Sequence, residues 1–115
     1  MTLTEFLEAR ISEDEAAARD DGADAMMGSR WKHYPEDAYN EIQSATLARC
    51  RRVLAECAAK RVVVRALAAR ESPDFESGNP RDVGATFAFR QVCLAFATVH
   101  ADHPDYDVTW ACRLT

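Results

Sequence analysis

Apolar residues near the start of the chain recur at steps of three and four, the spacing that gathers side chains on one face of an α-helix. This stripe consists of Leu3, Phe6, Leu7, Ile11 and Ala18. Thr2 and Glu5 precede and open it in the order of a capping box, in which two side chains bind otherwise unpaired amides at a helix start. Gly22 offers a natural stop. The pattern predicts an amphipathic helix over about residues 3–20.

Residues 45–70 give the strongest helix signal, because they contain no glycine or proline and are rich in alanine, leucine and arginine. One broad apolar arc is formed by Leu47, Cys50, Leu54, Cys57, Val64 and Leu67. Arg61 falls within this arc, and a charge on an apolar face must reach water or find an anionic partner. We expect a structural ion pair between Arg61 and an acid of the first helix or of the final segment, with Asp14 and Asp102 as the candidates.

A third helix is predicted over about residues 81–100. Asn79 suits the cap, Pro80 the first helical position and Asp82 the positive end of the helix. Its apolar residues surround the helix almost completely: Ala85, Phe87, Phe89, Val92, Cys93, Leu94, Phe96 and Val99. A helix of this kind is buried on more than one side, either between the other helices or partly against a second subunit.

The final segment must turn, because Pro104 cannot continue the third helix. A short C-terminal helix is predicted to follow, with Pro104 in its first turn and with Tyr106 and Trp110 on one side. Large aromatic residues mainly contribute buried apolar surface, so we favour the interpretation in which Tyr106 and Trp110 fold back and cap the bundle. The alternative is an exposed docking patch.

Between the first two helices, residues 22–44 lose the helical period and contain several breakers, which indicates a long connection that includes one helical turn after Pro35. Aromatic residues of such a connection more often lie over the core than bind a ligand. The second possibility is kept: the candidate protein-binding residues are Trp31, Tyr34, Tyr106 and Trp110.

These elements predict an all-α fold, a small bundle of three main helices plus a short C-terminal helix. The 115 residues suit a single helical domain over 1–115. No apolar run approaches the roughly 20 residues of a membrane span, and the first residues lack the features of a signal peptide. We therefore expect no membrane association, a cytoplasmic location and four reduced cysteines.

Charge is unevenly distributed: residues 45–70 are basic, whereas both flanking segments are acidic, and the net charge is −5. The bases of residues 45–70 scatter around the helix and do not form one stripe. The sequence therefore argues against nucleic-acid binding, since duplex affinity depends on a concentrated cationic surface.

Candidate chemistry is sparse. No closely spaced cysteine pair of the kind found in structural zinc sites occurs, nor does a glycine-rich phosphate loop, so no metal, cofactor or catalytic residue is expected. Four acids of the first helix lie on neighbouring turns: Glu5, Glu8, Glu13 and Asp14. Such a cluster can hold magnesium in all-helical hydrolases, and a hydrolase is the alternative function. A solvated acidic face is the favoured interpretation.

Three segments carry a resemblance to a known family: residues 6–19, residues 52–61 and the dense stretch 101–110, which reads Ala-Asp-His-Pro-Asp-Tyr-Asp-Val-Thr-Trp. Together they resemble a family of small actinobacterial and actinobacteriophage proteins catalogued as domain of unknown function 6221. The resemblance implies no reaction and no partner. The apolar third helix, the aromatic connection and the acidic face favour a protein that binds a protein partner or forms a homo-oligomer. The occurrence of the family in phages suggests an accessory factor that engages a component of the bacterial host, in the cytoplasm of that host, and a bacterial housekeeping role fits equally.

Overall fold

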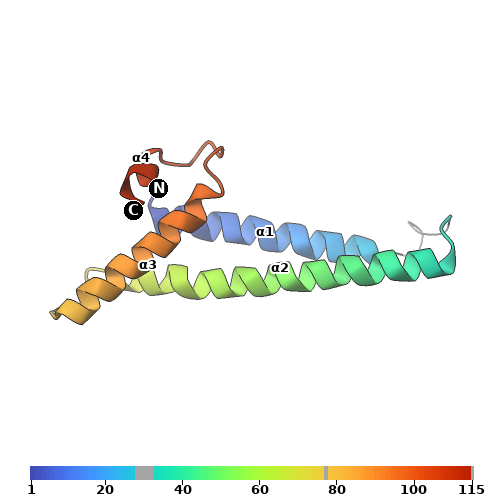
Figure 1. Cartoon of the computed structure of the whole chain (residues 1–115), viewed down its shortest axis with the longest axis horizontal. Helices are drawn as coiled ribbons and strands as arrows, with labels where there is room; N and C mark the ends of the chain where they lie inside the picture. Colours follow the sequence, from blue (N-terminus) through green and yellow to red (C-terminus); the bar gives the residue numbers. More distant parts are fainter. Residues whose placement is uncertain (28–32, 77, 115) are drawn as a thin grey trace. The chain divides into compact units, whose positions relative to one another are not determined.

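The computed structural model describes residues 1–27, 33–76 and 78–114, and all regular structure in these ranges is helical (Figure 1). The helices are α1 Leu3–Ala25, α2 Glu36–Arg70, α3 Pro80–Thr98 and α4 Thr109–Arg113. This confirms the predicted all-α fold with three main helices and a short C-terminal one. No helix within the described ranges has both the length and the apolar character that a membrane span requires.

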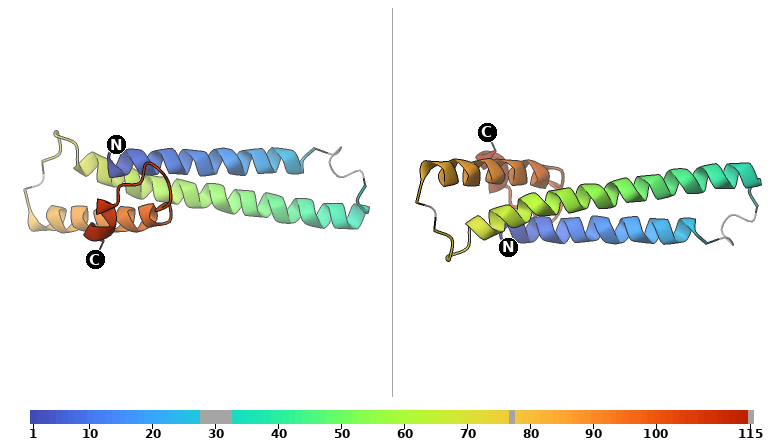
Figure 2. Two further views of the ribbon diagram at one scale, coloured as in Figure 1. Left: turned by 90° about the horizontal axis from the view of Figure 1, so that it is seen from above. Right: turned by 90° about the horizontal axis from the view of Figure 1, so that it is seen from below.

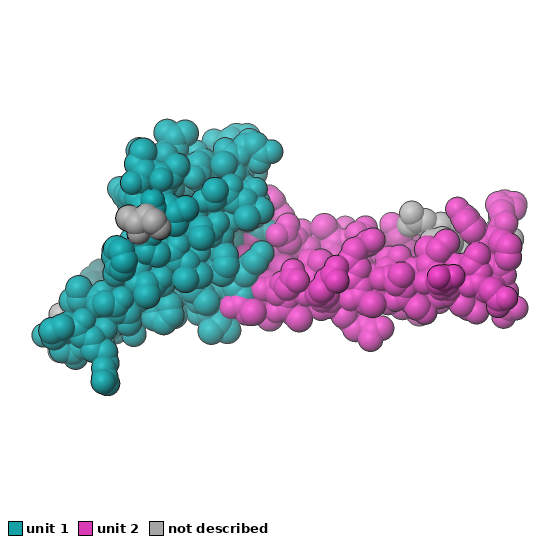
Figure 3. All heavy atoms as spheres, in the orientation of Figure 1, with its two compact units in different colours: residues 1–10, 60–115 teal, residues 11–59 magenta. Residues whose placement is uncertain are grey.

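The chain packs as two compact units, coloured separately in Figure 3. Unit 1 comprises residues 1–10 and 60–115, and unit 2 comprises residues 11–59. The predicted single-domain organisation over 1–115 stays a prediction.

Unit 2 is a pair of antiparallel helical stretches, residues 11–25 of α1 and 36–59 of α2, which lie side by side in both views of Figure 2. A Cβ placed on Gly22 would lie 3.9 Å from Sγ of Cys50, so the glycine fits against the facing helix. The sequence-based expectation that Gly22 ends α1 is therefore wrong. The helix continues to Ala25, because packing outweighs the roughly 1 kcal/mol that a helical glycine costs.

The start of α2 also differs from the prediction, since the helix begins at Glu36 and not near residue 45. Pro35 immediately precedes it, Glu36 and Asp37 occupy its first turn, and the Tyr39 amide donates to the Pro35 carbonyl at 2.9 Å. The Gln43 side chain donates at 2.9 Å to the carbonyl of Ala25, the last residue of α1. This bond satisfies a helix end and explains why a polar residue interrupts the apolar pattern there.

Unit 1 joins residues 3–10 of α1 and 60–70 of α2 to α3 and α4. Its buried core consists of Phe6, Leu7, Val64, Leu67, Cys93, Leu94, Ala97 and Trp110. Both predicted helix starts are confirmed. Thr2 and Glu5 exchange two 3.2 Å hydrogen bonds, and the Asn79 side chain accepts from the Asp82 amide at 2.9 Å with Pro80 in the first turn.

After α3 the chain continues through turns, and α4 begins at Thr109, five residues later than a helix opened by Pro104 would. The carboxylate of Asp107 accepts hydrogen bonds from the Thr109 amide at 2.9 Å and the Thr109 hydroxyl at 2.7 Å. These bonds lower the pKa of Asp107 below its ordinary value. The helix therefore starts where a side chain satisfies its first amide, and Pro104 lies in the preceding turn.

Candidate protein-binding surface

Phe6 is the centre of an aromatic cluster within unit 1. Its ring is fully buried, and four rings surround it with centroids 5.1 to 6.2 Å away: Trp110, His103, Tyr106 and His100. Arg10 is also buried, with its guanidinium carbon 5.2 Å from the Phe6 centroid and a hydrogen bond between its Nη1 and Nε2 of His103. The motif of residues 101–110 therefore covers the first turns of α1.

The predicted protein-binding residues separate into three groups. Trp31 lies outside the described residues. Tyr34 belongs to unit 2 and is 52% exposed. Tyr106 and Trp110 lie together, with ring centroids 5.3 Å apart, but Trp110 is only 5% exposed and Tyr106 is half-buried. Trp110 is therefore part of the core of unit 1, and a protein-binding role of the pair stays a prediction.

Arg61 forms an ion pair with an acid of the first helix. Its Nε lies 3.0 Å from Oε2 of Glu8, and Nε of Arg65 lies 3.6 Å from the other oxygen of the same carboxylate. Glu8 was not among the predicted partners. Of those, Asp102 is exposed and Asp14 is half-buried in unit 2, and their pairing with Arg61 stays a prediction.

Two of the four acids proposed for a magnesium site have structural contacts. Glu5 closes the capping box, and Glu8 binds two arginines. Within the described ranges, no group of three or more histidine, cysteine or acidic side chains could hold a metal ion. The contacts shown for Glu5 and Glu8 therefore give the hydrolase alternative no support.

The exposed side of α3 is the most unusual surface of unit 1. Every exposed residue of α3 after Arg81 is uncharged, and so is its exposed C-cap residue, Val99. These exposed residues are Val83, Gly84, Phe87, Ala88, Val92, Ala95, Thr98 and Val99. Phe87 is 53% exposed and Val99 76%. Six of these positions share one side of the helix at 100° per residue, and we call them the α3 outer face: Gly84, Phe87, Ala88, Val92, Ala95 and Val99. An exposed helix side without charge is typical of a contact surface.

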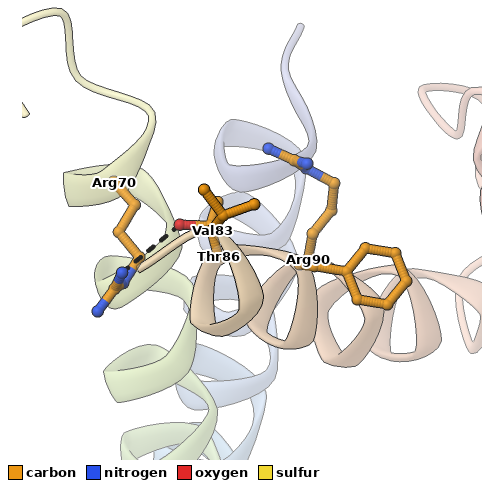
Figure 4. Close-up of a pocket in the computed structure, with 5 residues that line it drawn as sticks. Arg70, Val83, Thr86 and Arg90 are labelled. Atoms are coloured by element: carbon orange, nitrogen blue, oxygen red, sulfur yellow. Dashed lines mark hydrogen bonds between the residues drawn. The ribbon is translucent and has the colours of Figure 1, made fainter. Parts of the chain in front are cut away.

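A hollow of about 260 Å³ adjoins the first half of this face (Figure 4). It is lined by Arg70 of α2 and by Val83, Thr86, Phe87 and Arg90 of α3. In the close-up, Arg70 reaches from α2 toward Thr86, and the guanidinium of Arg90 lies well apart from that of Arg70. The two arginines therefore do not converge on a common ligand position.

Both arginines of the hollow have partners in unit 1. Nη1 of Arg70 donates to the Asp82 carbonyl at 3.4 Å and lies 4.0 Å from Oδ1 of the same residue, and its guanidinium carbon lies 5.2 Å from the Phe89 ring centroid. Nη2 of Arg90 lies 3.3 Å from Oε1 of Glu71. These contacts fix the start of α3 to the end of α2, and they present Val83 and Phe87 as the apolar wall of the hollow.

The opposite side of α3 holds buried residues, among them Cys93 and Ala97. Cys93 has no exposed surface, and burial raises the pKa of its thiol to about 11, with a smaller contribution from the negative charge of Glu71. A thiol with such a pKa is protonated at neutral pH and is a poor nucleophile. Cys93 therefore acts as a small apolar core residue.

Comparison with known proteins places the chain in a family. The model of the family of unknown function DUF6221 matches residues 1–112. The chain belongs to this family. The match includes all three segments that carried the resemblance in the sequence. Comparison with curated proteins and with solved structures found no match.

Proposed function

We propose that this chain is a protein-binding accessory factor whose binding surface is the α3 outer face. The observation that carries the proposal is the run of exposed, uncharged residues along α3. Elsewhere on soluble domains, exposed helix positions are mostly charged or polar, and contiguous apolar patches commonly mark contacts with other proteins.

Gly84 supports the same surface independently of the apolar side chains. It lies inside α3, its φ is not positive, and a Cβ placed on it would have no other atom within 4 Å. Neither backbone conformation nor packing in unit 1 therefore requires glycine, although glycine in a helix costs about 1 kcal/mol relative to alanine. Close approach of another backbone is a physical reason for a bare position on an exposed helix.

The partner is expected to present an apolar helix face. An amphipathic helix recognises such a surface through side chains spaced at three and four residues, which matches the spacing of the α3 outer face. Small residues at Gly84, Ala88 and Ala95 leave depressions between Phe87, Val92 and Val99 into which partner side chains fit. Following the family resemblance, we place this role in the cytoplasm of an actinobacterium or of the host of its phage.

The proposal is tested by one charge in the middle of the face. Ala95→Glu introduces a good helix former at an exposed position, so α3 should stay folded while a partner would have to bury a carboxylate. The measurement is chemical cross-linking and affinity capture with the full chain in a lysate of the organism that encodes it. Ala68→Glu, at an exposed alanine of α2 in unit 1, is the matched control.

We expect the wild type and Ala68→Glu to form the same cross-linked product, either with another protein of the lysate or, at about 0.5 mM protein, with further copies of the chain, and we expect Ala95→Glu to lose it. Identical capture by all three proteins, with circular dichroism showing that each is folded, would contradict the proposal.

A further inference from the structure

The two ends of the α3 outer face carry opposite charges. Arg81 lies one turn before Gly84, and Asp102 lies one turn after Val99. Both residues are exposed. The surface is therefore an uncharged strip with a cation at its first end and an anion at its last.

Asp102 lies just beyond the end of α3, which the structure places at Thr98. The amides of His100 and Ala101 donate to the carbonyls of Ala97 and Thr98, at 2.9 and 3.2 Å, and the His103 amide donates to the His100 carbonyl at 2.9 Å. Bonds to the third preceding residue are those of a tightened last turn, and here they reach Ala101. Asp102 is the next residue in the sequence, so it stays close to the last end of the outer face.

We propose that the α3 outer face binds a second copy of this chain, with the two α3 helices antiparallel about a two-fold axis. This inference rests on the proposed function and names the partner. With the axis between Gln91 and Val92, Gly84 of one copy faces Val99 of the other and Ala88 faces Ala95. In the same register Arg81 of one copy faces Asp102 of the other. Each of these facing pairs therefore contains either a small residue or two opposite charges.

The charges of Arg81 and Asp102 favour an antiparallel arrangement of the two α3 helices, and they favour a second copy of this chain as the partner. In a parallel pair, Arg81 would face Arg81 and Asp102 would face Asp102, and both contacts would be repulsive. The antiparallel pair has two attractive contacts, one at each end. A second copy meets this pattern by symmetry, because an isologous interface brings the same two ends together twice.

The size of the face sets the expected affinity. Residues 84–99 span roughly 24 Å of helix. One helix pair of this length buries less than the roughly 800 Å² per partner of a standard stable interface. The dimer should therefore be reversible, populated at about 0.5 mM protein and dissociating on dilution to the low micromolar range.

Charge exchange between the copies tests the inference in the full chain. Arg81→Glu places two acids opposite each other at both ends of its own dimer, and Asp102→Arg places two bases there. Each variant should self-associate roughly tenfold more weakly than the wild type at low salt. An equimolar mixture should recover the wild-type affinity, because both ends of the mixed dimer then hold opposite charges. Sedimentation equilibrium measures all three cases.

Neither substitution should unfold the chain. Glutamate at residue 81 stands at the positive end of α3, arginine at residue 102 stands near its negative end, and both sites are exposed. At about 1 M salt the differences between the proteins should shrink, because exposed charges are then screened within about 3 Å.

Three outcomes overturn the second-copy inference. One is a wild type that is monomeric up to about 0.5 mM, well above the range expected for even a small specific interface. A second is a mixture that associates as weakly as each variant alone. The third is self-association that Ala95→Glu leaves unchanged. If the wild type is monomeric but Ala95→Glu still loses a captured protein, the second-copy inference fails and the proposed function stands.

Discussion

Phe6 and Phe87 belong to the same unit, yet one is enclosed and the other is open. The Phe6 ring has no exposed surface, because residues 100–110 bring four rings around it. Phe87 is 53% exposed at the edge of the hollow beside Val83. The chain thus has a dedicated segment to cover one apolar region and leaves the other without a cover of its own.

This difference separates two uses of apolar residues. Residues whose neighbours come from the same chain contribute to folding, whereas residues that lack such neighbours contribute only when another molecule supplies them. Substitutions in the Phe6 cluster should therefore change stability, and substitutions on the α3 outer face should change association.

The largest expected effect comes from the matched pair Phe6→Ala and Phe87→Ala. Phe6→Ala removes a fully buried ring and should lower the free energy of unfolding by about 3–5 kcal/mol. Phe87→Ala removes a half-exposed ring and should lower it by less than about 1 kcal/mol. Urea denaturation followed by circular dichroism measures both, at a concentration where the chain is monomeric. Equal losses would show that Phe87 is as important to the fold as Phe6.

The enclosed side of α3 should also respond to alkaline pH. The pKa of Cys93 rises from an ordinary 9.0 to about 11 in the folded chain. Between these values the unfolded thiol has lost its proton and the folded thiol keeps it, so stability should decrease as pH rises from 9 to 11. The comparison is the pH dependence of thermal unfolding for the wild type and Cys93→Ala. A steeper decline in the wild type is expected, and parallel curves would argue against the shifted pKa.

The ion pairs of Glu8 should contribute less. Glu8→Gln leaves Arg61 and Arg65 without their shared carboxylate, and we expect a loss of about 1 kcal/mol, because the pair is only partly buried. Glu41→Gln changes an exposed acid of unit 2 and should have almost no effect. Denaturation at low and high salt distinguishes the two, since added salt should reduce the difference. A Glu8→Gln chain as stable as Glu41→Gln would mean that Arg61 is satisfied by other groups.

The smallest change sharpens the comparison most. Gly84→Ala should raise the free energy of unfolding by about 0.4–1 kcal/mol, because the site accepts a Cβ without strain or contact. The same methyl group should weaken association if another backbone approaches α3 there. Gly78→Ala, also at a position with open space, should leave association unchanged. Stabilisation together with unaltered association would remove Gly84 from the binding surface.

Much of the fold follows from local signals that the sequence states directly. Thr2 with Glu5 and Asn79 with Pro80 mark helix starts, because the side chains that satisfy the first amides are adjacent to them. The predicted helix boundaries were wrong where tertiary contacts determine the actual ones. Gly22 continues α1 because Cys50 faces it, and the polar Gln43 belongs to α2 because it binds the end of α1.

The candidate surface was only partly predictable. The sequence indicates that the third helix is apolar almost all round, and therefore that more than one of its sides has a partner. It does not tell which side the chain itself covers, because that depends on where residues 100–110 return. The aromatic residues singled out as docking sites include Trp110, which the return of this segment encloses. Their spacing alone could not distinguish a cap from a patch.

The contact between Phe6 and Trp110 also determines when unit 1 can finish folding. The two rings lie 5.1 Å apart in space, but more than one hundred residues of synthesis separate them. While the ribosome is still producing the middle of the chain, the apolar residues at the start of α1 are not yet covered by the aromatic residues of the final segment. During this time they are exposed to chaperones and to aggregation. Unit 1 can close only after translation has delivered Trp110, so ribosomal pausing late in the message would prolong the vulnerable stage.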